Sequence, residues 1–87
     1  MNREKHKTHL VSLHETYIRK NADYGDSFGK SVEKYGLIAG LVRISDKFNR
    51  AETLILGNPQ EVKDESLRDT LMDMANYCVM LAMELEE

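Results

Sequence analysis

The 87-residue sequence has one cysteine, one proline and no tryptophan. Cys78 has no partner for an internal disulfide, and its apolar neighbours lead us to expect a small core residue in a reducing compartment. The sequence shows no signal-peptide pattern and no apolar run near the length of a membrane span, so we expect a cytoplasmic protein without membrane contact. The net charge of -3 argues against a nucleic acid polymer as partner, because such proteins carry a basic surface.

Glycine and proline cluster at three breaks, and the segments between the breaks have helical spacing. The breaks are DYGDSFG at 23–29, YG at 35–36 and GNP at 57–59. Apolar residues recur every three or four positions over 3–21, 37–55 and from 64 onward, and a short helical turn is expected over 28–35. No stretch alternates as a strand would. The prediction is an all-α fold, a small antiparallel bundle of three long helices and one short connecting helix in a single domain over 1–87.

Two of the long segments carry a heptad-like apolar row that we expect to form the core. The first row is Leu37, Leu41, Ile44, Phe48, Ala51 and Ile55, and the second is Leu67, Leu71, Met74, Cys78, Leu81 and Leu85. The connecting loop is short, which favours antiparallel neighbours. Met80 and Met83 lie opposite the second row, so this helix is apolar on two sides, and one side is expected to face another subunit. Small domains often gain stability from self-association, so we expect a homo-oligomer, a dimer or higher.

Charged residues gather opposite both apolar rows. On the third long segment a set of four polar residues shares an arc of roughly 80°, and on the second a set of four shares roughly 100°. These sets are Glu65, Asp69, Asp73 and Asn76, and Arg43, Asp46, Lys47 and Arg50. Both arcs could simply face water. They could also form an ion-pair ladder between the helices, in which an exposed pair contributes about 0–1 kcal/mol.

A binding site is the third interpretation of these arcs. Carboxylates on successive turns repel one another unless a cation lies between them, and Mg²⁺ prefers such oxygen ligands together with substrate phosphates. We therefore expect Mg²⁺, or Mn²⁺ in its place, to be held by Glu65, Asp69, Asp73 and Asp46. The basic residues of the facing helix, Arg43, Lys47 and Arg50, would hold phosphate oxygens.

The DYGDSF segment at 23–28 has a structural and a functional interpretation. In the first, Asp23 caps a helix, Gly25 allows a turn, and Tyr24 and Phe28 pack on the core. In the second, Tyr24 or Phe28 stacks on a base, which is worth about 1–3 kcal/mol per base. Asp23 would then bind a base edge or assist the metal.

Three segments of the sequence together resemble the nucleotide modification associated domain 1 family, small proteins common in phages and bacteria. They are KNADYGDSF, YGLIAGLVRISDKFNRAETL and DESLRDTLMDMANYCVMLAMEL, and the resemblance covers residues 20 to 86. A wider similarity is to all-α NTP pyrophosphatases of the MazG-like and dimeric dUTPase-like kinds. That similarity implies Mg²⁺-dependent cleavage of nucleoside triphosphates between the α and β phosphates. The acids of the third segment are spaced by four residues, whereas that signature has three.

Three functions stay open at this point. The first is a Mg²⁺-dependent nucleotide pyrophosphohydrolase of phage or bacterial nucleotide metabolism, with Asp69 and Asp73 as catalytic residues whose metal activates a water. Asn76 and Tyr24 would then contact sugar or base. The second is a non-catalytic protein that sequesters or senses a nucleotide in the same pocket. The third is a helical assembly module whose charges serve assembly alone.

Overall fold

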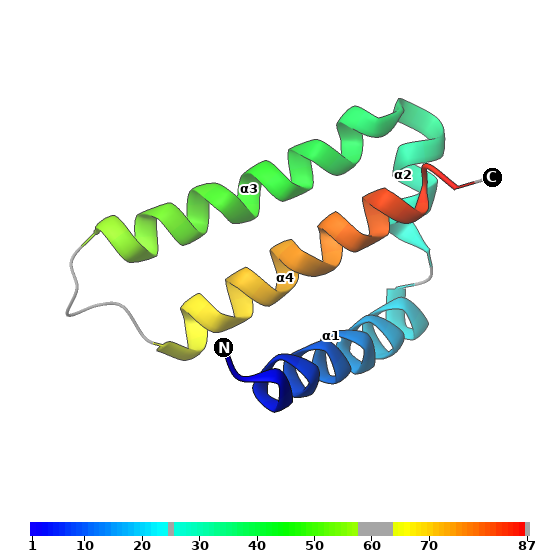
Figure 1. The fold of residues 1–87 in the computed structure, drawn as a ribbon. Coiled ribbons are helices and arrows are strands. Elements are labelled where there is room, and N and C mark those ends of the chain that lie inside the picture. The colour runs from blue at the N-terminus through cyan, green and yellow to red at the C-terminus, as the bar shows by residue number, and fades with distance from the viewer. Residues whose placement is uncertain (25, 58–63, 87) are drawn as a thin grey trace.

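Four helices and no strand make up the part of the chain that the structure describes. This computed structural model describes residues 1–24, 26–57 and 64–86, with the backbone alone at 23, 24, 64 and 65. The helices are α1 (Arg3–Tyr24), α2 (Ser27–Tyr35), α3 (Leu37–Leu56) and α4 (Asp64–Met83) (Figure 1). The all-α prediction with three long helices and a short one is confirmed. Helix α1 runs three residues further than expected, and dimerisation stays a prediction.

Local sequence explains the ends of the short helix. The Asp26 side chain caps α2, its Oδ1 accepting a hydrogen bond from the Gly29 N–H at 3.1 Å. At the other end Gly36 has φ 86°, a region that glycine enters without strain, and its N–H donates to the Val32 carbonyl at 2.7 Å. The chain therefore reverses within one residue, and α3 starts directly after it.

Helices α3 and α4 are antiparallel neighbours, as the short loop predicted (Figure 1). The two helices come close at the buried Gly40, where an added Cβ would lie 2.6 Å from Leu81 Cδ1 and 2.9 Å from Phe28 Cζ. Phe28 on α2 is buried and stacks on Tyr77 of α4, with ring centroids 5.8 Å apart. Glycine at this position thus brings α2, α3 and α4 together.

More than half of the residues in the two apolar rows are exposed, which corrects the expectation that these rows form the core. Ala51 is buried, but Leu41 and Phe48 are about half exposed, and Cys78, expected inside, is exposed. Both helices are turned by about a quarter of a turn from the expected orientation. Small and polar residues, Gly40 and Thr70 among them, lie between α3 and α4 instead.

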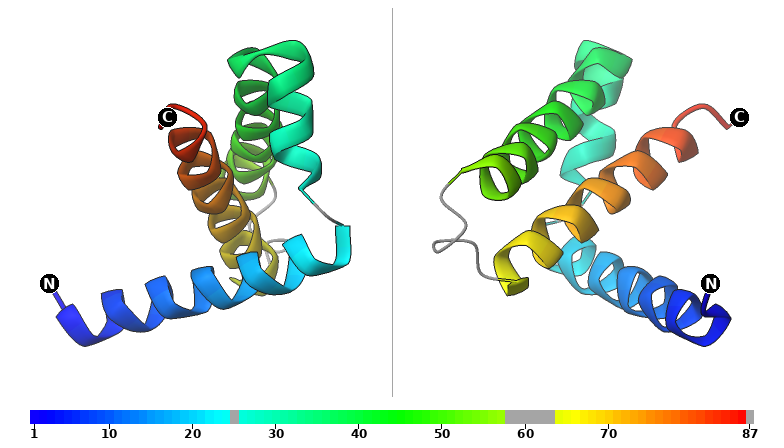
Figure 2. Two further views of the ribbon diagram at one scale, coloured as in Figure 1. Left: turned by 90° about the vertical axis from the view of Figure 1, so that its right-hand side faces the viewer. Right: turned by 60° about the vertical axis from the view of Figure 1, so that its left-hand side comes forward.

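Helix α1 crosses α4 on the side away from these exposed rows (Figure 2). Its first ten residues, 3–12, are exposed, and its C-terminal half packs on α4. Asn76 of α4 donates a hydrogen bond from Nδ2 to the Leu13 carbonyl at 3.1 Å, which joins the two helices. None of the described helices is both long and apolar enough to cross a bilayer.

Candidate functional site, a polar cavity between the helices

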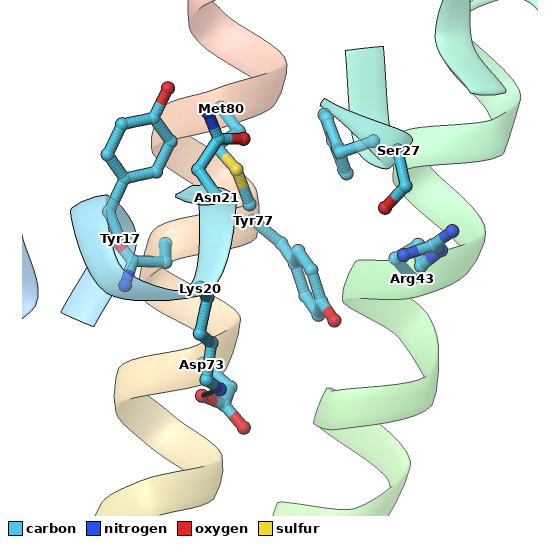
Figure 3. A pocket seen from close by; sticks show the side chains of 10 residues that line it. Tyr17, Lys20, Asn21, Ser27, Arg43, Asp73, Tyr77 and Met80 are labelled. Carbon is cyan, nitrogen blue, oxygen red and sulfur yellow. Dashed lines mark hydrogen bonds and ion pairs between the residues drawn. The ribbon is translucent and has the colours of Figure 1, made fainter. Parts of the chain in front are cut away.

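A cavity of about 310 Å³ lies where all four helices meet, a size within the range of roughly 300–1,000 Å³ that is usual for small-molecule sites. Figure 3 shows its walls: Tyr77 projects from α4 toward Arg43 of α3, and Lys20 of α1 extends to Asp73. Aromatic, cationic and amide side chains line it together. They are Tyr17, Lys20, Asn21, Ser27, Phe28, Arg43, Asp73, Asn76, Tyr77 and Met80.

Asp73 joins three helices through two ion pairs. Lys20 Nζ of α1 lies 3.0 Å from Asp73 Oδ1, and Lys47 Nζ of α3 lies 3.3 Å from Asp73 Oδ2. The carboxylate is about a quarter exposed, so water screens both pairs and their stabilising effect is modest. Two lysines therefore pair with this one carboxylate, and Arg43 of α3 adds a further cationic group to the cavity lining, so the cationic groups at the cavity outnumber the Asp73 carboxylate.

Three of the predicted site residues come together at this cavity, and a fourth, Lys47, lies close by. Arg43, Asp73 and Asn76 line it, and Lys47 reaches it through Asp73. Arg50 points elsewhere: its Nε donates to Thr70 Oγ1 at 3.2 Å, and that buried hydroxyl donates to the Ser66 carbonyl at 2.8 Å. The ion-pair ladder considered from the sequence would join Arg43 or Arg50 to Asp69 or Asp73, whereas among the described side chains Asp73 pairs with Lys47 and Lys20 instead.

The remaining predicted residues lie apart from the cavity or outside the described side chains. Asp46 is exposed on α3 and lines neither cavity described in this section. Asp69 is exposed on α4, one turn before Asp73. The side chains of Asp23, Tyr24 and Glu65 lie outside the described residues, so their predicted roles stay predictions.

The described carboxylates do not assemble the predicted metal centre by themselves. Among the described side chains, those of residues 1–22, 26–57 and 66–86, no three of His, Cys, Asp or Glu gather closely enough to hold a metal ion. Asp73 is occupied by two lysines, and Asp46 is exposed. Since the predicted ligand set also contains Glu65, the Mg²⁺ site stays a prediction.

Six residues of the cavity were not among the predicted site residues, and Ser27 and Met80 are two of them. Tyr17, Lys20 and Asn21 enter from α1, and Tyr77 follows Asn76 on α4. Tyr77 could have been found, because it belongs to the DESLRDTLMDMANYCVMLAMEL segment that carries the family resemblance. Lys20 and Asn21 open the KNADYGDSF segment and could have been found in the same way. Tyr17 lies outside the three segments, and the crossing of α1 over α4 brings it to the site (Figure 2).

A second, more open cavity continues along α1 and α4. Its volume is about 590 Å³, and Lys20 and Asp73 line both cavities, so their ion pair stands between them. Its other lining residues are largely polar, namely Lys5, Thr8, His9, Ser12, Thr16, Arg19, Arg68, Asp69 and Met72. Asp69 therefore lies beside the first cavity and faces the second.

Fold and site together define a small all-helical protein with a cationic, aromatic cavity between its helices. Residues 20–85 match the family model described as nucleotide modification associated domain 1. The chain belongs to that family, as the three sequence segments predicted. Comparison with curated proteins and with solved structures gives no match.

Proposed function

We propose that the protein binds a nucleotide in the cavity between its four helices and acts by holding it. The observation that carries this proposal is the meeting of Lys20, Arg43 and Lys47 with two tyrosines around one cavity. Cationic side chains hold phosphate oxygens, and tyrosine rings stack on bases. The family's association with nucleotide modification supports the same ligand class.

The electrostatics of the cavity favour an anionic ligand. Asp73 is the one carboxylate among the residues that line it, and two lysines already compensate its charge. Arg43 has no described carboxylate partner within ion-pair distance, and its planar fork suits bidentate binding of a phosphate. Asn21, Ser27 and Asn76 offer hydrogen bonds for sugar or base.

Binding is tested by titrating the full chain with a panel of nucleoside mono-, di- and triphosphates, using calorimetry and the shift in melting temperature. Arg43→Ala should weaken binding about 10- to 100-fold, because a hydrogen bond to a charged group is worth about 1.5–3 kcal/mol. Arg3→Ala is the matched control, since Arg3 is exposed at the start of α1 and lines neither cavity. If no nucleotide binds, or if both variants bind equally well, the proposal is wrong.

Hydrolysis of the nucleotide is the second candidate, and the placement of Asp69 and Asp73 favours it. They stand one turn apart on α4 and both line the second cavity, beside the cationic residues. Glu65, one turn before Asp69 in the sequence, would complete a carboxylate row for Mg²⁺ or Mn²⁺. The distant resemblance to all-α NTP pyrophosphatases supports this candidate. Such an enzyme would act in phage or bacterial nucleotide metabolism in the cytoplasm.

The two candidates are separated by their products. The protein is incubated with nucleoside triphosphates and Mg²⁺, and in parallel with Mn²⁺, and monophosphate and pyrophosphate are measured. Turnover that Asp69→Asn abolishes would establish hydrolysis. Tight binding without any product would leave the binding function alone. Since Asp69 is exposed, its substitution should leave the fold intact.

A further inference from the structure

An exposed apolar row runs along the whole of α3. It consists of Leu37, Leu41, Phe48 and Ile55, which are 48, 53, 54 and 55% exposed. At roughly 100° per residue these four side chains fall within an arc of about 40°. Their spacing of four and seven residues is that of a seam between packed helices. Single exposed apolar residues are common on protein surfaces and need no explanation, but a continuous row indicates a contact surface.

Helix α4 carries a matching row on the same side of the molecule. Leu71, Cys78 and Ala82 are exposed and share an arc of about 40°. On each helix the row lies about a quarter turn from the residues at the α3–α4 contact, in the same rotational sense about that helix's own axis. Because the helices are antiparallel, equal turns of the same sense bring both rows to one side of the pair.

Nothing in the described part of the chain covers this apolar face. In the left view of Figure 2, α1 and α2 lie below and to the right of the α3–α4 pair, and no described helix lies on its upper left. The proposed nucleotide cavity, lined from α1 and α2, opens on the covered side. The buried apolar residues of the described chain are Phe28, Val32 and Ala51, which is a small core for four helices.

We propose that a second copy of this chain covers the face formed by the rows of α3 and α4, so that four long helices pack as a two-fold bundle. Helices of 20 residues are about 30 Å long, and a packed pair is about 20 Å wide. The face thus projects roughly 600 Å², and its corrugated accessible surface approaches the ~800 Å² per partner of a standard interface. A heptad-spaced face accepts another helix pair, and identical faces satisfy the self-complementarity of a two-fold dimer.

Charges at the rim indicate how the copies are arranged. The Lys47–Asp73 and Arg50–Thr70 contacts set the antiparallel register of α3 and α4, and in that register Glu52 lies level with Arg68. Both side chains are exposed, and by helical spacing each lies next to its row on the side away from the α3–α4 contact, where Arg68 also lines the second cavity beside α1. A two-fold axis parallel to the helices places α3 of one copy against α4 of the other, with Glu52 beside the other copy's Arg68. The rim is then complementary in charge along both edges.

The mass of the full chain in solution tests the proposal. Light scattering or sedimentation should give about twice the monomer mass of 10.0 kDa, with dissociation on dilution. Leu41→Glu should weaken association about 30-fold or more, as expected for an interface hot spot. The adjacent Val42→Glu is the matched control, because Val42 is 52% exposed but points away from the face. A monomeric wild type, a larger assembly, or equal masses for the two variants would overturn the proposal.

Two further measurements keep the test informative if Leu41→Glu does not fold. The melting temperature of the wild type should rise with protein concentration, and dilution should speed thiol labelling of Cys78, which lies on the face. Labelling of Cys78 at one rate at every concentration would count against the face. For the arrangement, Glu52→Arg and Arg68→Glu should each weaken association about tenfold, and the double variant should restore it. Additive weakening in the double variant would refute the pairing of α3 with the other copy's α4.

Discussion

Replacing Gly40 by alanine tests the close approach on which both the fold and the cavity depend. In an exposed helix position this change is stabilising by about 1 kcal/mol, because glycine is the poorer helix former. At Gly40, however, the added Cβ would lie 2.6 Å from Leu81 Cδ1 and 2.9 Å from Phe28 Cζ. Overpacking of this kind typically costs about 1–3 kcal/mol. We therefore expect Gly40→Ala to lower the free energy of unfolding by about 0–2 kcal/mol in net terms.

The two neighbours of the new methyl group decide the size of this effect. Leu81 Cδ1 is the end of a flexible side chain and can move by rotation. Phe28 Cζ belongs to a buried ring that is held by stacking on Tyr77, so its displacement also disturbs the wall of the cavity. The variant should accordingly weaken nucleotide binding as well as stability.

Urea unfolding followed by circular dichroism measures the stability change, at one protein concentration because association would shift the transition. The pair Asn49→Ala and Asn49→Gly is the control, since Asn49 is exposed on the same helix and isolates helix propensity. Alanine should be the more stable of that pair by about 1 kcal/mol, opposite in sign to its effect at position 40. If Gly40→Ala raises the free energy of unfolding by as much as the difference between Asn49→Ala and Asn49→Gly, α3 and α4 are not in close contact at position 40.

Two further substitutions test the polar contacts between the helices. Thr70→Val removes the hydroxyl that accepts from Arg50 and should lower the free energy of unfolding by about 1–3 kcal/mol in the same urea assay. Thr70→Ser keeps the hydroxyl and should retain most of the wild-type stability. A Thr70→Val protein as stable as wild type would rule out this contact. Asp73→Asn should tighten nucleotide binding by removing the carboxylate from the cavity, as measured by calorimetry, but it should abolish product formation if a metal held by Asp73 drives hydrolysis. Weaker binding in the absence of metal would contradict the charge argument.

The helices themselves could be predicted because their limits depend on local chemistry. Gly36 and Gly57 end α2 and α3 as expected from the sequence, each donating its N–H to a carbonyl four residues earlier. Helical spacing then identified the long segments between the breaks. Only the start of α2 and the end of α1 moved, by one and three residues, within the uncertainty that fraying gives to helix ends.

The rotation of α3 and α4 could not be predicted in the same way. An apolar row shows that a helix face prefers to be buried, but it does not say whether the same chain or another one buries it. Gly40, which is not part of the row, and Ala51, at the row's edge, permit a close contact beside Leu41 and Phe48, and so α3 meets α4 there. A lone glycine inside a helical pattern was the available signal for this contact.

The site residues that lie on the charged arcs of α3 and α4 could be predicted from helical spacing in the sequence. The residues that reach the site because α1 crosses α4 could not be predicted from such spacing. Arg43, Asp73 and Asn76 were found because arcs on neighbouring antiparallel helices converge. Tyr17 and Lys20 come from α1, whose angle across α4 is a tertiary property that no spacing within α1 encodes. Arg43 and Lys47 were expected to supply the cationic groups of the site, and Lys20 of α1 adds one that was not among the predicted site residues.

The polar contact between α3 and α4 and the apolar face outside it have a common physical explanation. Apart from Leu81 against Gly40, the side chains named at the α3–α4 contact are small, polar or charged, so their contact removes little apolar surface from water. Ion pairs that water reaches, such as Lys47–Asp73, add about 0–1 kcal/mol each, which is less than one buried Leu or Phe contributes. Most of the apolar surface that could stabilise the α3–α4 pair, including Leu41 and Phe48, therefore lies on the uncovered face. A partner on that face would hold the spacing of α3 and α4, and this spacing also sets the width of the nucleotide cavity on the opposite side.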